Sequence, residues 1–190
     1  MDLKLLKHST VYRGRVFNII VDDVEYPSGN RSVREVAEHG GGAVVLALFE
    51  DERIMMVNQH RYPFNDFILE LPAGKLEKGE DPLHCAQREL GEETGYRASE
   101  WRKLTSMFTT PGFCSEVLHI YLATGLSALE RGRMLEEGEQ TMTLRFLPLG
   151  EAIAMIERQE IRDGKTICGI LLGERLLRSS AGAGRATSPH

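Results

Sequence analysis

The pattern of apolar and polar positions in the first forty residues predicts β structure. Residues 15–39 hold two extended segments on either side of the turn signal Pro27-Ser28-Gly29-Asn30, which predicts a β-hairpin. After the glycines at 40–42, the apolar run 43–50 and the segment 53–61 predict adjacent strands, the first buried on both faces. Further strands are expected at residues 67–72, 102–109, 116–123 and 142–147, and helices at 81–94, 150–158 and 166–177.

The helix expected at residues 81–94 carries clear start and stop signals. Asp81 is expected to be the N-cap with Pro82 at the first helical position, and Gly95 is expected to be a left-handed stop. The positions expected to face the core are Leu83, Ala86 and Leu90. Because strands and helices are mixed irregularly along the chain, an α+β fold around a mixed sheet is favoured over a doubly wound one.

A length of 190 residues suits one domain with a small appendage. The hydrophobic content of 42% and the charged content of 27% are those of an ordinary globular protein. We expect residues 1–40 to form an N-terminal antiparallel β extension and residues 41–178 to form the main domain. Residues 179–190 are rich in Ser, Gly and Ala, which predicts a disordered tail.

Charge and cysteine content indicate which partners and which cellular compartment to expect. A formal net charge of −5 argues against nucleic acid as a partner. Cys85, Cys114 and Cys168 show no metal-ligand spacing, which favours unpaired thiols in a reducing compartment. The N-terminus has no long apolar segment and no run approaches eighteen apolar residues, so we expect a cytoplasmic protein without a membrane partner.

The predicted helix at 81–94 places several carboxylates on one face. Glu89, Glu92 and Glu93 stand at i, i+3 and i+4, where each like-charge pair costs a few tenths of a kcal/mol. A solvated acidic face is the plain alternative. Two observations speak against that alternative. The single positive charge of Arg88 is too little to neutralise the three glutamates, and the preceding loop adds two more carboxylates. Hard divalent cations require clustered carboxylates, so the pattern favours metal-assisted chemistry on a phosphate compound.

These residues also resemble a known motif. Gly74, then Glu80 after five residues, then Arg88–Tyr96 after seven more, is similar to the Nudix box, with Tyr96 at the final aliphatic position as a departure. The resemblance implies a Nudix-type α/β/α sandwich around a mixed sheet, with the box forming a loop, a helix and a loop. It also implies hydrolysis of nucleoside diphosphates linked to another moiety.

The resemblance assigns roles by position. Glu89 and Glu93 are expected to be the principal metal ligands, with Glu93 counted among the catalytic residues as well. Glu92 is expected to be a further or water-mediated ligand, and the carbonyl of Ala73 is expected to complete the site. The cofactor implied is Mg²⁺, with Mn²⁺ as the alternative. Residues expected to support the loop and the helix are Gly74, Glu80 and Arg88.

Features outside the box suggest the substrate. The run Glu70–Glu77 is similar to the start of the box in ADP-ribose pyrophosphatases, and Pro111 matches a proline that marks this group. A plain turn between two strands is the alternative explanation of Pro111. Residues 160–166, EIRDGKT, also resemble this branch, but GDP-mannose hydrolases carry a similar segment.

The expected reaction is therefore Mg²⁺-dependent hydrolysis of ADP-ribose to AMP and ribose 5-phosphate. GDP-mannose or another nucleoside diphosphate sugar is the alternative substrate. A non-catalytic nucleotide sensor on the same scaffold is less favoured, because every glutamate of the box is present.

Two features are expected to complete the site. In the resembling enzymes a mobile acidic loop presents a pair of glutamates over the metals, and within residues 131–140 the best match is Glu137 and Glu139, with Glu139 slightly favoured as the base. A solvated loop is the alternative. Arg61, at the end of a predicted strand, is expected to bind diphosphate oxygens, since a guanidinium can bind two oxygens at once. A surface arginine is its alternative.

The N-terminal extension is not needed to complete a Nudix core. In the resembling group such an extension exchanges strands with a second subunit and supplies part of the adenosine pocket. We therefore expect a homodimer, with Phe17 or Arg34 as contributors to the neighbour's site.

Overall fold

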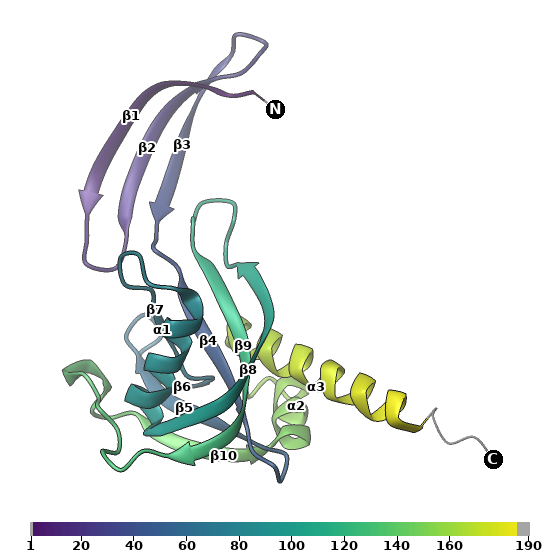
Figure 1. Cartoon of the computed structure of the whole chain (residues 1–190). Coiled ribbons are helices and arrows are strands. Elements are labelled where there is room, and N and C mark those ends of the chain that lie inside the picture. The colour runs from purple at the N-terminus through teal and green to yellow at the C-terminus, as the bar shows by residue number, and fades with distance from the viewer. Residues whose placement is uncertain (1, 186–190) are drawn as a thin grey trace.

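The computed structural model describes residues 2–185, which form a three-stranded N-terminal sheet standing off a larger body (Figure 1). The small sheet is antiparallel in the order β1-β2-β3. Its hairpin turn lies at the predicted place, where the backbone N–H of Tyr26 donates to the carbonyl of Asn30 at 2.8 Å. The strands of the small sheet are β1 (Lys4–Arg13), β2 (Asn18–Glu25) and β3 (Arg31–Glu38).

The body is built on a mixed sheet in the order β10-β5-β4-β9-β8, with β6 paired to β5 and β7 to β4. Strands β4 and β9 run parallel, and the other pairings of this sheet are antiparallel. Its strands are β4 (Gly42–Leu48), β5 (Arg53–Arg61), β6 (Asp66–Glu70), β7 (Ala73–Lys75), β8 (Tyr96–Phe108), β9 (Val117–Ala128) and β10 (Thr143–Pro148). The predicted mixed sheet is therefore confirmed.

Helices cover both faces of this sheet (Figure 1). Strand β4 is buried throughout, and alternate side chains enter two separate cores. Val44 and Leu46 pack toward α2 and α3, whereas Ala43 and Val45 pack toward α1. The arrangement is the expected α/β/α sandwich. The helical segments are α1 (Pro82–Glu89), the π turn η1 (Leu90–Thr94), the 3₁₀ turn η2 (Glu137–Glu139), α2 (Leu149–Glu157) and α3 (Gly164–Arg185).

Several boundaries differ from those expected. Strand β1 was not singled out by the sequence, and β8 starts at Tyr96 rather than residue 102, because it is an edge strand whose exposed polar residues hide the pattern. Helix α3 continues to Arg185, so the predicted disorder from residue 179 does not hold for residues 179–185. The segment contains no proline before residue 189, so its backbone can continue the helical hydrogen bonds. Residues 186–190 of the predicted tail lie outside the described residues.

The three cysteines are unpaired, as expected. Cys85 is buried under the box loop, and burial raises the pKa of its thiol to about 12. Cys114 and Cys168 are half-buried. Within residues 2–185, every helix is too short or too polar to span a bilayer.

The helix layer of α2 and α3 can be tested through Leu46. This side chain is fully buried in β4 and lies directly under Gly173 of α3. Replacing Leu46 with Ala leaves a cavity that the sheet cannot close, so we expect a loss of about 2–5 kcal/mol in the free energy of unfolding, measured by urea denaturation. Leu171→Ala, on an exposed position of α3, should cost less than about 0.5 kcal/mol. Equal losses would contradict this packing.

Candidate active site

The acidic helix begins and ends where the sequence indicates. The side chain of Asp81 accepts hydrogen bonds from the backbone N–H groups of Leu83 at 2.9 Å and His84 at 3.3 Å, with Pro82 at the first position. Gly95 ends the helix in the left-handed conformation, at φ 74°. The last turn, Leu90–Thr94, is a π turn, which the sequence did not predict. Such wider turns inside helices are frequent at functional sites.

Glu89 and Glu93 both lie against strand β7. Glu93 is only 2% exposed, and its Oε2 accepts a hydrogen bond from the backbone N–H of Ala73 at 3.0 Å. Glu89 lies against Gly74 so closely that a Cβ added there would stand 1.8 Å from Glu89 Oε1. Glycine at position 74 is therefore required for the carboxylate to fit. Glu92 is more exposed, and it binds the same Arg88 nitrogen as Glu89 does.

Burial disfavours the ionised form of these two carboxylates. Loss of solvent, together with the neighbouring charges of Glu89 and Glu139, raises the pKa of Glu93 to about 8. Burial likewise raises the pKa of Glu89. Two desolvated carboxylates side by side favour a positive charge between them, and such perturbed groups cluster at functional sites.

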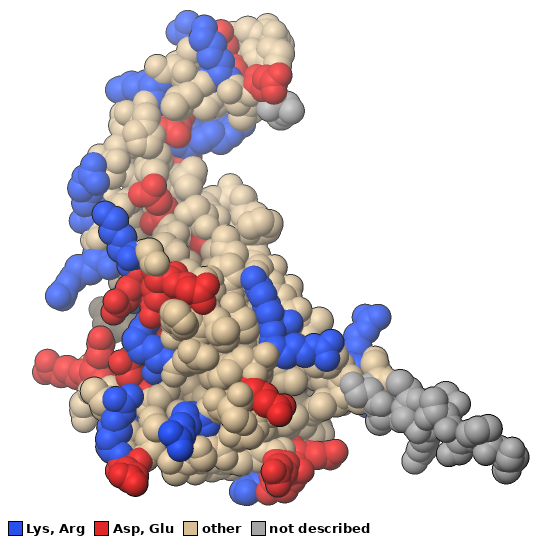
Figure 2. All heavy atoms as spheres, in the orientation of Figure 1, with Lys and Arg blue, Asp and Glu red and all other residues tan. Residues whose placement is uncertain are grey.

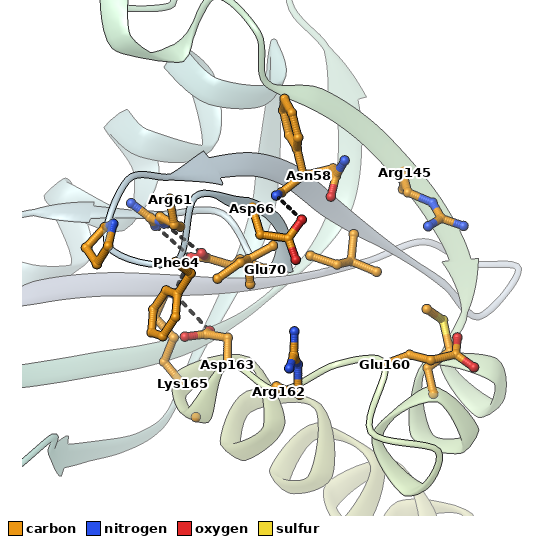
Figure 3. A pocket seen from close by; sticks show the side chains of 16 residues that line it. Asn58, Arg61, Phe64, Asp66, Glu70, Arg145, Glu160, Arg162, Asp163 and Lys165 are labelled. Atoms are coloured by element: carbon orange, nitrogen blue, oxygen red, sulfur yellow. Dashed lines mark hydrogen bonds and ion pairs between the residues drawn. The ribbon is translucent and has the colours of Figure 1, made fainter.

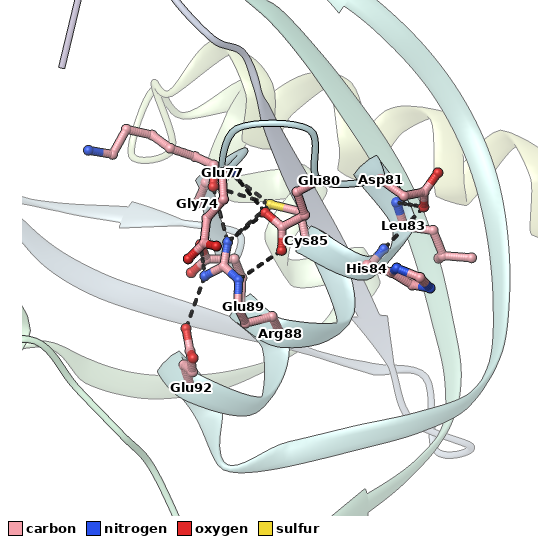
Figure 4. Close-up of polar contacts among 11 residues, drawn as sticks. Gly74, Glu77, Glu80, Asp81, Leu83, His84, Cys85, Arg88, Glu89 and Glu92 are labelled. Carbon is pink, nitrogen blue, oxygen red and sulfur yellow. Dashed lines mark hydrogen bonds and ion pairs between the residues drawn. The ribbon is translucent and has the colours of Figure 1, made fainter.

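Arg88 supplies part of that charge (Figure 4). Its Nε and Nη2 bind the Glu80 carboxylate at 3.0 and 3.1 Å, which ties the loop to the helix. Its Nη1 also binds Glu89 Oε1 at 2.7 Å and Glu92 Oε2 at 3.0 Å, two contacts that the sequence did not predict. The hydrogen bond from Arg88 lowers the pKa of Glu80 to about 2. Glu80 is therefore a permanent anion that anchors Arg88.

The donor set fits a hard divalent cation. Among the described residues, no three His, Cys, Asp or Glu side chains converge closely enough to enclose a metal ion. Even so, Glu89 and Glu93 offer buried carboxylate oxygens, and a nearby cation would stabilise their charged forms. Carboxylate oxygens are ligands that Mg²⁺ prefers. The Ala73 N–H contacts Glu93, so the backbone of β7 lies beside the same carboxylate.

A second charged cluster lies at a neighbouring pocket (Figure 3), and three of its members, Arg61, Asp163 and Lys165, also line the cavity that holds Glu89 and Glu93. Arg61 binds the buried Glu70 carboxylate through Nε at 2.7 Å and Nη2 at 2.6 Å. Lys165 donates to the same carboxylate and also to Asp163 Oδ2 at 2.8 Å. Burial opposes ionisation of Glu70, but its hydrogen bond from Arg61 and the charge of Lys165 outweigh it and lower its pKa. The cluster orients Arg61, and its two cations are paired with two carboxylates, those of Glu70 and Asp163.

The segment EIRDGKT joins this cluster to the box. Asp163 caps α3 by accepting from the backbone N–H of Thr166 at 3.1 Å. The buried hydroxyl oxygen of Thr166 in turn accepts from the backbone N–H of Leu71 at 2.9 Å. The N-terminus of α3 is thus fixed to the chain that leads into Ala73. Sequence reasoning recognised this segment and the run from Glu70, but it assigned no roles to Glu70, Asp163 or Lys165.

A cavity of about 1020 Å³ unites most of the predicted site residues. Figure 2 shows acidic side chains gathered over the loop before α1, with Lys and Arg on the neighbouring N-terminal strands. The turn between β1 and β2 also reaches the cavity, through Arg15 and Val16, which the sequence did not indicate. The predicted residues that line the cavity are Arg61, Ala73, Gly74, Arg88, Glu89, Glu92, Glu93 and Glu139.

Other predicted residues lie outside this cavity. Glu137 is exposed on the 3₁₀ turn and does not line it, whereas Glu139 does. Pro111 is exposed in the turn between β8 and β9, which is bonded to β3 instead. Arg34 is held within the N-terminal sheet by Ser32 and Tyr26, and Phe17 packs near Tyr12. Glu80 lies behind Arg88 and acts on the site through that residue.

Comparison with known proteins agrees with this geometry. Residues 38–168 match the NUDIX domain family. Over 170 residues the chain is 42% identical to the ADP-ribose pyrophosphatase of Bacillus subtilis (strain 168), covering 90% of this chain and 91% of that protein. Over 167 residues it is 44% identical to the methanol dehydrogenase activator of Bacillus methanolicus, covering 88% and 90%. The chain therefore belongs to the Nudix family, which confirms the resemblance of its box.

A solved structure described as "Crystal structure of ADP compounds hydrolase" superposes with a TM-score of 0.82. The match covers 95% of this chain and 96% of that one at 20% sequence identity. At this identity the likeness shows the fold, and it extends over the N-terminal sheet as well as the body.

The tight contact at Gly74 can be tested by adding a single methyl group. Gly74→Ala would push the Glu89 carboxylate out of place, so we expect Mn²⁺ affinity, followed by electron paramagnetic resonance, to fall about 10-fold or more. Gly112→Ala, in a turn where an added Cβ meets nothing within 4 Å, is the matched control and should bind Mn²⁺ normally. Unchanged affinity in Gly74→Ala would remove Glu89 from the metal site.

Proposed function

We propose that the protein hydrolyses the diphosphate of ADP-ribose to AMP and ribose 5-phosphate, with Mg²⁺ as the cofactor and Mn²⁺ as the alternative. The observation that carries this proposal is the buried pair of Glu89 and Glu93, set in one cavity with Arg61, whose guanidinium is oriented by Glu70. The pair suits a divalent metal, and the guanidinium suits a diphosphate. The name of the Bacillus subtilis relative supports ADP-ribose as the substrate.

Each wall of the cavity has a separate task in this reaction. Glu89, Glu93 and the carbonyl of Ala73 would hold the metal, with Glu92 at its margin. When bound, the metal polarises the phosphoryl oxygens and lowers the pKa of water. Arg61 uses its Nε and Nη2 on Glu70, so its remaining N–H groups are available to the diphosphate.

Glu139 is the residue that we assign to the water. It lines the cavity, and its charge acts on both Glu89 and Glu93. Its carboxylate would orient the water and take its proton while the water oxygen bonds to phosphorus. The bridging P–O bond then breaks, and the second phosphate leaves with its sugar. Glu70 binds both Arg61 and Lys165, and so holds Arg61 in place.

A substrate panel tests the proposed function. At equal Mg²⁺, ADP-ribose should give the highest kcat/KM, with AMP and ribose 5-phosphate as products identified by chromatography. Glu93→Gln removes a buried charge from the metal site and should lower kcat by at least about 100-fold. A strong preference for GDP-mannose would overturn the substrate. Tight binding of ADP-ribose without Mg²⁺-dependent turnover would instead indicate a nucleotide sensor.

The choice of base is tested by two neighbouring variants. Glu139→Gln should lower kcat by about 100-fold or more, because the proton acceptor is lost. Glu137→Gln, which removes an exposed carboxylate outside the cavity, should stay within about 2-fold of the parent. Steady-state kinetics at saturating Mg²⁺ measures both. The opposite order would move the role to Glu137.

We also propose that the protein is a homodimer that forms through its N-terminal sheet, and that it acts in the cytoplasm. The sheet exposes an unusual number of apolar side chains, which favours burial against a second copy. Its Arg15 and Val16 reach the cavity, so pairing of this sheet would also affect the site. The unpaired cysteines support a reducing compartment. The exposed apolar residues include Leu5, Val11, Tyr12, Phe17 and Val33.

Sedimentation equilibrium checks the dimer. The wild-type protein should sediment at twice the chain mass of 21.3 kDa. Val11→Lys places a charge on the exposed apolar sheet and should raise the dimer dissociation constant by about 10-fold or more. Leu171→Lys, an exposed leucine on α3, should leave it unchanged. A monomeric wild type would exclude the proposed assembly.

A further inference from the structure

The acidic loop is docked on the end of the metal-binding helix through backbone contacts. The backbone N–H of Leu129 donates to the Gly95 carbonyl at 2.7 Å, and that of Met134 donates to the Glu92 carbonyl at 2.8 Å. Between them Gly132 turns the chain in the left-handed region, at φ 66°. The fit is close, because a Cβ added at Gly95 would lie 3.0 Å from the carbonyl carbon of Gly132. The loop therefore caps the helix.

Arg133 adds two side-chain hydrogen bonds to this cap. Its Nε donates to the carbonyl of Glu93 at 2.6 Å, and its Nη2 donates to the carbonyl of Met142 at 3.0 Å. Met142 is buried at the point where the loop returns to β10. One guanidinium thus joins the outgoing stem of the loop, its returning stem and the end of the helix. A lysine ammonium lacks the planar fork that spans two carbonyls.

The residues enclosed by these stems include the proposed base. Glu139 Oε2 accepts from the backbone N–H of Glu136 at 3.1 Å, and the Glu139 carbonyl accepts from the backbone N–H of Met142 at 2.8 Å. Glu139 is therefore two hydrogen bonds away from Arg133, by way of Met142. The same guanidinium binds the backbone of Glu93, whose carboxylate faces the cavity. Arg133 connects the backbone of a metal ligand to the backbone that carries the base.

We propose that Arg133 is a positioning residue that fixes the distance between the Glu139 carboxylate and the metal-binding carboxylates by joining the Glu93 and Met142 carbonyls. This inference rests on the proposed role of Glu139. It does not make Arg133 a contact of the substrate, because Arg133 does not line the cavity. The loop is thus anchored at both stems, and only its central residues remain free to adjust.

The test is a double-mutant cycle with Arg133→Gln and Glu139→Gln. Arg133→Gln alone should lower kcat for ADP-ribose by about 10- to 100-fold, the cost of a misplaced reacting group. KM and Mn²⁺ affinity should change by no more than about 2-fold, because the helix ligands stay in place. In the Glu139→Gln background the same change should cost no more than about 2-fold, since the group it positions is absent.

Two further variants separate positioning from charge. Arg133→Lys keeps the charge and should recover little of the lost kcat. Arg131→Gln removes a nearby loop arginine that makes no hydrogen bond or ion pair with any described residue, and it should behave like the parent. Full rescue by lysine, or an equal cost of Arg133→Gln in both backgrounds, would overturn the proposal. So would a loss of Mn²⁺ affinity as large as the loss of kcat.

Hydrogen exchange provides a readout that needs no activity. The amides of residues 134–142 should exchange faster in Arg133→Gln than in the wild type and in Arg131→Gln. Unchanged exchange would show that Arg133 does not hold the loop. If the wild type does not hydrolyse ADP-ribose, the proposed function fails while this measurement still decides the structural link. If Glu139→Gln keeps wild-type turnover, the base is wrong and the positioning role fails with it.

Discussion

The burial of Glu89 and Glu93 side by side is the constraint around which the site is built. Desolvation raises the pKa of both carboxylates, the charge of Glu89 raises that of Glu93 as well, and neighbouring donors offset part of this cost. The Ala73 N–H satisfies one oxygen of Glu93, and Arg88 satisfies one oxygen of Glu89. These contacts leave a net negative pocket, and a divalent cation is the remaining partner that such a pocket requires.

The same constraint explains why distant segments converge here. The negative pocket alone would repel a diphosphate, so cationic donors are needed in the same cavity. Arg61 and Lys165 both line it, and the buried Glu70, which binds both, keeps them in a fixed place. Thr166 then fastens the N-terminus of α3 to the chain entering the box. The sandwich fold thus serves the site by bringing β5, β6 and α3 to the edge of β7.

What the sequence could predict depended on local signals. Asp81, Pro82 and Gly95 mark the helix ends by their own chemistry, and the apolar run of β4 marks its burial on both faces. The contact of Lys165 with Glu70 could not be found in this way, because the partners stand 95 residues apart and neither has a local pattern. The π turn was missed because its hydrophobic positions also fit an α-helix. Arg133 was missed because its partners are backbone carbonyls, which no residue type reveals.

The helix of the box therefore serves the site through both its side chains and its backbone. Its side chains face the cavity, and its last carbonyls, at Glu92 and Glu93, receive the acidic loop. Glu89 and Glu93, four residues apart, face one side of the helix, while the chain ends at Gly95 under the loop. Any movement of the metal ligands must then carry the loop stems with it. The metal site and the water-activating residue are set by one rigid element, which is the condition for a reaction that depends on their separation.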